Sequence, residues 1–155
     1  MTDQPHGCDL RRGRLSLDGQ IYLIAAVTHQ SYPYFRVLAA GRILVREMMR
    51  SDAFGCSKTM AFVVMPDHLH WLLSLENAAS LSSLVGNLKL NSARKVNDLI
   101  ARRGHPVWQR GFHDHALHGE AAIIEAARYI IANPLRAGLA RRVGDYPLWD
   151  AVWLL

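Results

Sequence analysis

Two histidines separated by one residue, His68 and His70, have the clearest chemical potential in this sequence. They open an apolar run directly after Met65-Pro66-Asp67. Successive side chains of a β-strand alternate between its two faces, so a strand here would place both imidazoles on one face. Two imidazoles on one side can share a divalent cation, with a third ligand from elsewhere in the chain. Taken alone, the triplet more commonly marks histidines that bind no metal.

A second pair with the same spacing, His113 and His115, competes for this role. Its neighbours are more polar, and the segment around it is ambiguous between strand and loop. By spacing alone, the pair is either an alternative set of metal ligands or part of a surface that binds phosphate.

A tyrosine and an asparagine stand out on the segment 120–132, whose apolar residues fall on one stripe of a predicted helix. Tyr129 and Asn133 lie roughly opposite this stripe, one turn apart. A phenol held on a helix can act as a nucleophile, and an amide oxygen can bind a hard cation. The structural alternatives are a surface tyrosine and an Asn-Pro pair that ends the helix.

These residues must be positioned by a small α+β fold. The order of predicted elements is βαββαβ followed by one more helix, which matches the ferredoxin-like arrangement of an antiparallel sheet with two helices on one face. The extra helix carries Tyr129. Ser80 is a predicted N-cap, Gly104 a predicted helix stop, and Pro134 ends the last helix. The predicted strands are 21–28, 59–64, 68–75 and 112–117, and the predicted helices are 36–50, 81–103 and 120–132.

The composition fits one globular domain over residues 1–155. The chain has 18 Lys and Arg against 13 Asp and Glu, a net charge of +5, and 15 of the cations are Arg. Clustered arginine suits phosphate binding, although a solvated basic surface has the same composition. Cys8 and Cys56 have no zinc spacing and are expected to be free, buried thiols. No apolar run is long enough for a signal peptide or membrane span, so we expect a cytoplasmic protein.

Five segments together carry a resemblance to a known family: VVMPDHLHWLLSL, NLKLNSARKVN, VWQRGFHDHAL, RYIIANPLRAGLA and DYPLW. In this order they resemble the REP-associated tyrosine transposases, members of the single-tyrosine HUH superfamily, over roughly residues 21–149. The resemblance implies a ferredoxin-like fold with the tyrosine on a late helix. It also implies a metal-dependent enzyme that nicks and joins single-stranded DNA through a 5′-phosphotyrosine intermediate, acting on hairpin-forming repeats.

The same resemblance implies roles for individual residues. Tyr129 would be the nucleophile, and His68, His70 and Asn133 would bind Mg²⁺ or Mn²⁺. The general base stays open among His113, His115 and Glu125. The expected contacts to single-stranded or hairpin DNA are phosphate contacts and one stacking aromatic: Arg110, Arg136, Lys89, Arg94, His115 and Trp108.

Two other functions remain open from the sequence. One is a DNA-binding regulator of the same fold that does not cleave. The other is a histidine phosphoesterase, which would not need Tyr129 and whose HxHxH pattern is missing here because Leu72 follows Trp71. The apolar stripe of the last helix must pack while Tyr129 faces the histidines. The tyrosine therefore serves either its own chain, in a crevice, or a partner's site in a homodimer.

Overall fold

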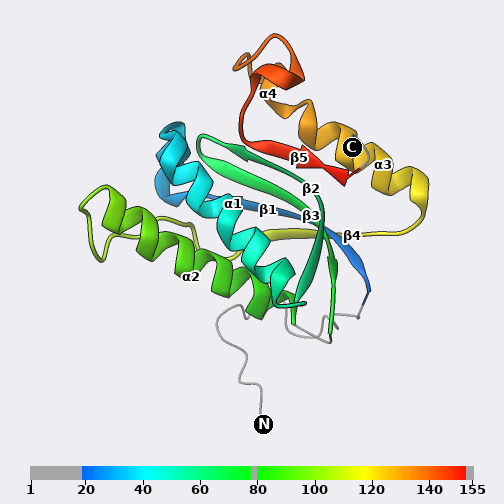
Figure 1. Ribbon diagram of the computed structural model, residues 1–155, viewed down its shortest axis with the longest axis horizontal. Coiled ribbons are helices and arrows are strands. Elements are labelled where there is room, and N and C mark those ends of the chain that lie inside the picture. The colour runs from blue at the N-terminus through cyan, green and yellow to red at the C-terminus, as the bar shows by residue number, and fades with distance from the viewer. Residues whose placement is uncertain (1–18, 78–79, 153–155) are drawn as a thin grey trace.

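A five-stranded sheet organises the computed structural model, which describes residues 19–77 and 80–152 (Figure 1). Helices α1 and α2 lie together on one side of the sheet, and α3 lies on the other side with the short α4 at its end (Figure 1). The strands are β1 Ile21–Val27, β2 Ser57–Met65, β3 His68–Leu75, β4 His113–Leu117 and β5 Trp149–Ala151. The helices are α1 Leu38–Ala53, α2 Leu81–Leu99, α3 Glu120–Ile131 and α4 Asn133–Arg136, with 3-10 turns at His29–Ser31, Tyr34–Arg36 and Val143–Asp145.

The strand order β4-β1-β3-β2-β5 confirms the ferredoxin-like prediction. Every neighbouring pair is antiparallel, and β3 lies between β1 and β2, as the split βαβ arrangement requires. Strands β2 and β3 form a hairpin whose turn is Pro66 and Asp67, two residues with turn-forming chemistry. The histidine pair therefore begins the central strand of the sheet.

Each face of the sheet has its own hydrophobic core. Along β3, Leu69, Trp71 and Leu73 belong to the core under α1 and α2, and all three are 0% exposed. Leu72 instead joins the core under α3, together with Ala127 and Ile130. Because side chains alternate along a strand, His68 and His70 share the face of Leu72 and lie on the α3 side.

The helix boundaries differ from the predicted ones at two places. Ser80 caps α2 as predicted, accepting a bond from the Ser83 N–H at 2.9 Å. The helix ends at Leu99 rather than near Gly104, because Ala101 adopts φ 56° and the Arg102 N–H turns back to the Asn97 carbonyl at 2.9 Å. This pattern closes the last turn as a Schellman motif, so Gly104 is not the helix stop.

Pro134 also acts differently from the prediction. It occupies the first turn of α4, where its missing N–H costs nothing, so it helps to start a second short helix as α3 ends. The strand β5 was not predicted from the sequence, since three residues are too short to show an alternating pattern. Just before β5, Leu148 packs closely on Gly41 of α1, where a Cβ would lie 2.3 Å from Leu148 Cδ1 and would displace that side chain.

The two cysteines and the length of the helices were also the subject of predictions. Cys56 is free and only partly buried, whereas Cys8 lies outside the described residues. In the parts of the chain that the structure describes, no helix has the length and apolar character needed to cross a membrane.

The packing of α3 can be tested at Ile130, whose side chain is 0% exposed in the second core. We expect Ile130→Ala to lower the free energy of unfolding by about 2–5 kcal/mol, since a buried cavity adds to the lost apolar transfer. Urea denaturation followed by circular dichroism measures this. The matched control is Leu90→Ala on α2, 52% exposed, which should change stability by less than about 0.5 kcal/mol. Equal losses in both variants would contradict the assigned packing of α3.

Candidate active site

The two histidines of β3 stand side by side, as strand alternation predicts. Their ring centroids are 5.0 Å apart and the ring planes are nearly perpendicular, at 85°. His68 is opposite Val27 of β1 and Met65 of β2, and His70 is opposite Ala25 and Val63. Both residues are thus fixed by ladders on both sides, which holds their backbone in one register.

Asp67 orients the first histidine. Its Oδ1 lies 2.7 Å from His68 Nδ1. An ionised carboxylate only accepts hydrogen bonds, so the Nδ1 atom carries the proton and donates it to Asp67. The other ring nitrogen, Nε2, is then the one left with a lone pair. A carboxylate behind an imidazole in this way is the common arrangement that orients a metal-binding histidine.

His70 is held in its neutral form. Burial lowers the pKa of His70 from 6.5 to about 4, with smaller contributions from His68 and from the cation of Arg136. Its Nδ1 atom is buried and has no hydrogen-bond partner. A neutral imidazole with an unsatisfied nitrogen is costly in an apolar site and is the protonation state that binds metals.

Tyr129 meets His70 within one chain. The ring centroids of the two residues are 6.2 Å apart, with the planes at 78°. Tyr129 is 53% exposed, while its neighbour Ile130 is fully buried. Adjacent residues of α3 therefore face solvent and the core, respectively. The apolar stripe can therefore pack on the sheet while the phenol faces the histidines, and the geometry needs no partner chain.

Arg136 fixes the tyrosine from the other side. Its Cζ atom lies 4.0 Å from the centroid of the Tyr129 ring, and its Nη2 donates to the Tyr129 carbonyl oxygen at 2.7 Å. A guanidinium over a phenol face is a favourable cation–π contact. Arg136 was expected only as a phosphate contact. Its place against the ring was missed because α3 ends at Ile131 and Arg136 lies on the separate helix α4, so the spacing along one helix does not relate the two residues.

The residues expected to bind a cation, His68, His70 and Asn133, are two imidazoles and an amide. Among the described residues, no cluster of three or more His, Cys, Asp or Glu side chains could hold a metal ion. Three buried side-chain polar atoms in this part of the chain lack a hydrogen-bond partner: His70 Nδ1, Asn133 Nδ2 and Asn97 Oδ1. Two of these belong to residues expected to bind metal. Turning the Asn133 amide over would replace Nδ2 by the oxygen at the same position, so an amide–imidazole donor set fits the residues present.

The second histidine pair lies on β4, at the edge of the sheet. Strand 112–117 was predicted as ambiguous, and the structure forms it as His113–Leu117 paired with β1. His113 is opposite Ala25 and His115 is opposite Leu23, and both histidines are exposed. Because Ala25 is also opposite His70, His113 and His70 belong to one row on the same face.

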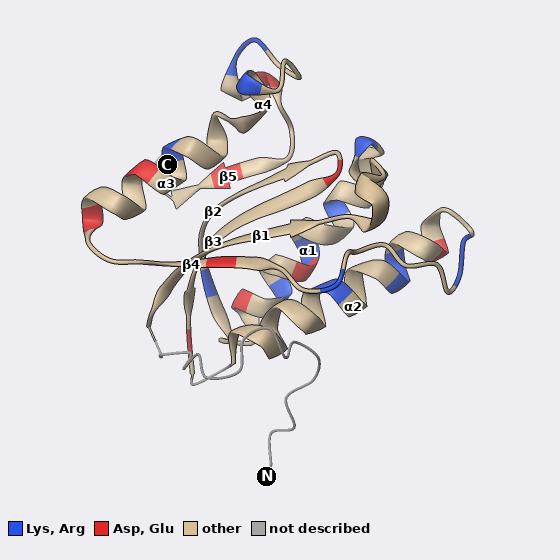
Figure 2. Ribbon diagram, turned by 180° about the vertical axis from the view of Figure 1, so that it is seen from behind, with Lys and Arg blue, Asp and Glu red and all other residues tan. Residues whose placement is uncertain are grey.

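The expected DNA contacts are spread over different parts of the molecule. Figure 2 shows Lys and Arg on α1, α2, the segment that follows α2, and the α4 region. Arg110 is exposed beside the end of β1, where the Gln109 N–H binds the Val27 carbonyl at 2.9 Å. Arg94 is exposed on α2, on the opposite side of the sheet from the histidines. Lys89 donates to the Gln109 carbonyl at 2.7 Å and so ties α2 to this segment.

The expectation that Trp108 stacks on DNA bases needs correction. Its side chain is 9% exposed, its ring packs 5.4 Å from that of Phe35, and its Nε1–H donates to Ser92 Oγ at 3.0 Å. A base cannot stack on a ring that is already enclosed by the core. The sequence did not distinguish a buried tryptophan from an exposed one.

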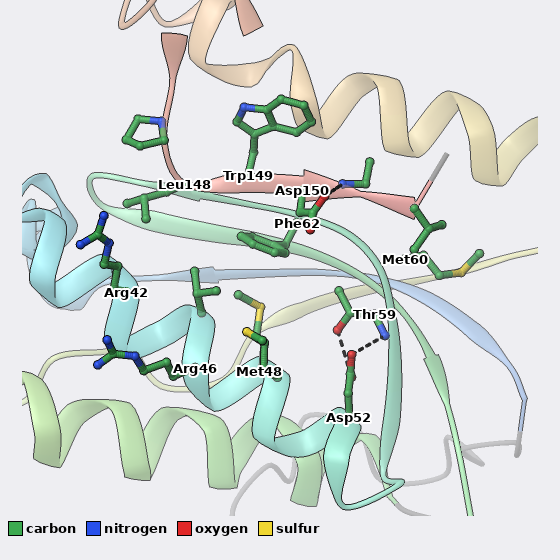
Figure 3. Close-up of a pocket in the computed structure, with 15 residues that line it drawn as sticks. Arg42, Arg46, Met48, Asp52, Thr59, Met60, Phe62, Leu148, Trp149 and Asp150 are labelled. Atoms are coloured by element: carbon green, nitrogen blue, oxygen red, sulfur yellow. Dashed lines mark hydrogen bonds between the residues drawn. The ribbon is translucent and has the colours of Figure 1, made fainter. Parts of the chain in front are cut away.

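A cavity of about 520 Å³ lies away from the histidines, between α1, β2 and β5 (Figure 3). It is lined by Met48 and Phe62 from the first core, with Arg42 and Arg46 at its α1 side. Asp52 at its other end is engaged by the N–H and the hydroxyl of Thr59, both at 3.0 Å (Figure 3). None of the residues that line this cavity belongs to the candidate site, so it contributes no group to that site.

Comparisons with known proteins bear on the family and on the fold. The model of the family described as "Transposase IS200 like" matches residues 41–133. A candidate REP-associated tyrosine transposase of Haemophilus influenzae is 27% identical over 99 residues, which span 58% of this chain and 56% of that protein.

Two solved structures share the fold. A REP-associated tyrosine transposase bound to a REP hairpin has a TM-score of 0.72 and 19% identity, over 88% of this chain and 79% of that one. A candidate transposase of Deinococcus radiodurans has a TM-score of 0.53 and 20% identity, over 77% and 94%.

The neutral state of His70 can be tested by NMR. Since its pKa is lowered to about 4, its ring should stay uncharged as the pH falls from 7 to 5 and protonate only near pH 4. The measurement is a titration of the His70 Cε1–H resonance in metal-free protein, assigned by the loss of that signal in His70→Gln. A titration midpoint near pH 6.5, the ordinary histidine value, would contradict the buried environment described above.

Proposed function

Because this chain belongs to the IS200-like transposase family, we propose that it cuts and rejoins single-stranded DNA through a covalent bond to Tyr129. One observation carries the proposal: an exposed phenol lies 6.2 Å, ring to ring, from His70 and under the guanidinium of Arg136, all in one chain. A hydrolytic phosphoesterase would have no use for a phenol at this place. A tyrosine nucleophile needs to be exposed, oriented and close to groups that bind phosphate.

The proposed reaction exchanges one phosphodiester for another. The Tyr129 oxygen attacks the scissile phosphorus, the bond from phosphorus to the 3′ oxygen breaks, and the products are a 5′-phosphotyrosine and a free 3′-OH. The covalent bond keeps the free energy of the phosphodiester, so a 3′-OH can reverse the step and join strands without ATP. Arg136, held at the ring of Tyr129, places a fixed positive charge where the phosphate must come.

A divalent cation fits the residues of this site. We propose that His68, His70 and Asn133 hold Mg²⁺ or Mn²⁺, which when bound neutralises negative charge on the non-bridging phosphate oxygens. The three protein donors are all neutral, so the anionic phosphate itself supplies the charge that such an ion prefers. Asp67 acts behind His68, where it keeps the Nδ1 proton and the ring orientation fixed.

The proposed substrate is DNA that folds into hairpins within repeats. This proposal rests on the fold shared with a transposase that was solved with a REP hairpin. Exposed Arg110 beside the end of β1 and exposed His115 on β4 are the proposed phosphate contacts, and Arg94 and Lys89 would serve only DNA that extends round to α2. We propose a monomer as the active form, since the tyrosine and the histidines come from one chain. The proposed location of this activity is the cytoplasm.

The covalent step is tested with labelled single-stranded hairpin DNA and Mn²⁺, followed by a denaturing gel. We expect a protein–DNA adduct that resists SDS with the natural sequence. Tyr129→Phe should abolish the adduct, since it removes only the attacking oxygen, and should keep DNA affinity. His68→Ala should reduce adduct formation by at least about 100-fold, the scale of losing electrostatic stabilisation of the transition state.

Two outcomes separate the competing functions. DNA binding with no adduct in the unaltered protein would favour the regulator that does not cleave. Cleavage that survives in Tyr129→Phe would favour a hydrolytic reaction with another nucleophile. Mixing Tyr129→Phe with His68→Ala tests the cis assignment, because activity restored in the mixture would require a tyrosine from a partner chain.

Metal binding is tested by paramagnetic broadening. Mn²⁺ should broaden the ring resonances of His68 and His70 in the natural sequence, and more strongly once an uncleavable DNA strand is bound to Tyr129→Phe. Asn133→Ala should weaken Mn²⁺ binding about 10-fold or more, while Asn133→Asp should strengthen it by adding a negative ligand. Broadening centred on His113 and His115 instead would assign the ion to the second pair.

A further inference from the structure

The histidine pair of β4 has no assigned task in the chemistry, yet its first member lies in the same row as His70. Ala25 of β1 is directly opposite His70 on one side and His113 on the other. Directly opposite residues of antiparallel strands point to the same face. Two strand spacings separate the backbones of the two histidines by about 10 Å. The residue between them is alanine, so β1 itself places nothing larger than a methyl group between the two imidazoles.

Tyr129 and His113 lie on opposite sides of His70. Helix α3 packs on β2, β3 and β5, so the phenol comes from the β2 side of His70. His113 belongs to β4, on the far side of β1, and its side chain is exposed. In the strand order β4-β1-β3-β2-β5, His70 on β3 is thus placed between the nucleophile and His113.

This placement matters because substitution at phosphorus is an in-line reaction. The attacking and leaving oxygens lie on opposite sides of the phosphorus atom. If Tyr129 attacks from the α3 side, the 3′ oxygen departs toward β1 and β4. Among the described side chains of the Ala25 row, His113 is the group on that side that can donate a proton.

We propose that His113 is the general acid of the cleavage step, a role that rests on the function proposed above. The bond between the Tyr129 oxygen and phosphorus forms, and the phenolic proton passes to solvent. The bond between phosphorus and the 3′ oxygen breaks, and the His113 imidazolium gives its proton to that oxygen. In the joining step the neutral imidazole takes the proton back from the attacking 3′-OH. Histidine suits both directions because it exchanges protons near neutral pH.

The neighbours of His113 fit this assignment. Asp114 is opposite Ile24, a residue of the core under α1 and α2, so its carboxylate belongs to the other face of β4. His115 lies on the same face as His113 but one row further along, opposite Leu23 and in line with Leu72. It is therefore the more distant of the two imidazoles from His70.

The test uses two DNA substrates that differ in one atom. One has the natural 3′ oxygen at the scissile bond, and the other has sulfur in its place. A thiolate leaves without a proton, since a thiol ionises near pH 8.5 and an alcohol far above it. We expect His113→Ala to slow adduct formation on the oxygen substrate by about 100-fold or more, and to form the adduct on the sulfur substrate at nearly the natural rate. The affinity for uncleaved DNA should stay unchanged.

The matched control is His115→Ala. Any loss in this variant is one of DNA affinity, so it should be the same for the oxygen and sulfur substrates. A loss in His113→Ala that is equal on both substrates, or no loss at all, overturns the assignment of a general acid. If the natural protein forms an adduct on neither substrate, the proposed function fails instead, so the two failures are distinguishable. Because His113 is exposed, its variant should keep the melting temperature of the natural protein.

Discussion

The strict alternation of side chains along β3 is the constraint on which the candidate site depends. Leu69, Trp71 and Leu73 are locked into the core under α1 and α2, all fully buried. The intervening residues must then point to the opposite face, which places His68 and His70 beside one another under α3. A slip of one residue would move both imidazoles into the core under α1 and α2 and the tryptophan to the α3 face, so hydrophobic packing on one face fixes the position of the histidines on the other.

Neighbouring residues of α3 also differ in burial. Ile130 is buried against the sheet and Tyr129 is half exposed above His70. The tyrosine gains its orientation from contacts rather than from burial. Arg136 binds its carbonyl and covers its ring, so the side chain is held although 53% of it is exposed. Burial of one side of the helix and exposure of Tyr129 are compatible because α3 is amphipathic.

The electrostatics of the site suit an anionic partner. Burial lowers the pKa of His70 to about 4, and the Nδ2 atom of Asn133 is buried without a hydrogen-bond partner. Among the described residues no group of three or more His, Cys, Asp or Glu side chains could hold a metal ion. Asp67 is the carboxylate in contact with the pair, and it is engaged with His68. The guanidinium of Arg136, which lies over the Tyr129 ring, is a positive charge beside these residues. A phosphodiester would bring the negative charge that this group of residues lacks, and an unpaired buried nitrogen or amide gains a partner when an ion and a phosphate arrive.

The sequence by itself determined much of this protein. The periodicities predicted four of the five strands, the three longer helices and their order, and the spacing of His68 and His70 placed both on one face. It did not determine β5 or the burial of Trp108, because both depend on contacts between residues distant in the chain. It also did not determine the end of α2 at Leu99, which follows from a local turn in which Ala101 adopts a positive φ with no glycine to signal it. Only the tertiary structure decided that Tyr129 and His70 meet within one chain, and that His113 lies in the same row of the sheet as His70. Strand order and helix placement have no local signature, since they follow from how two separate cores pack on one sheet.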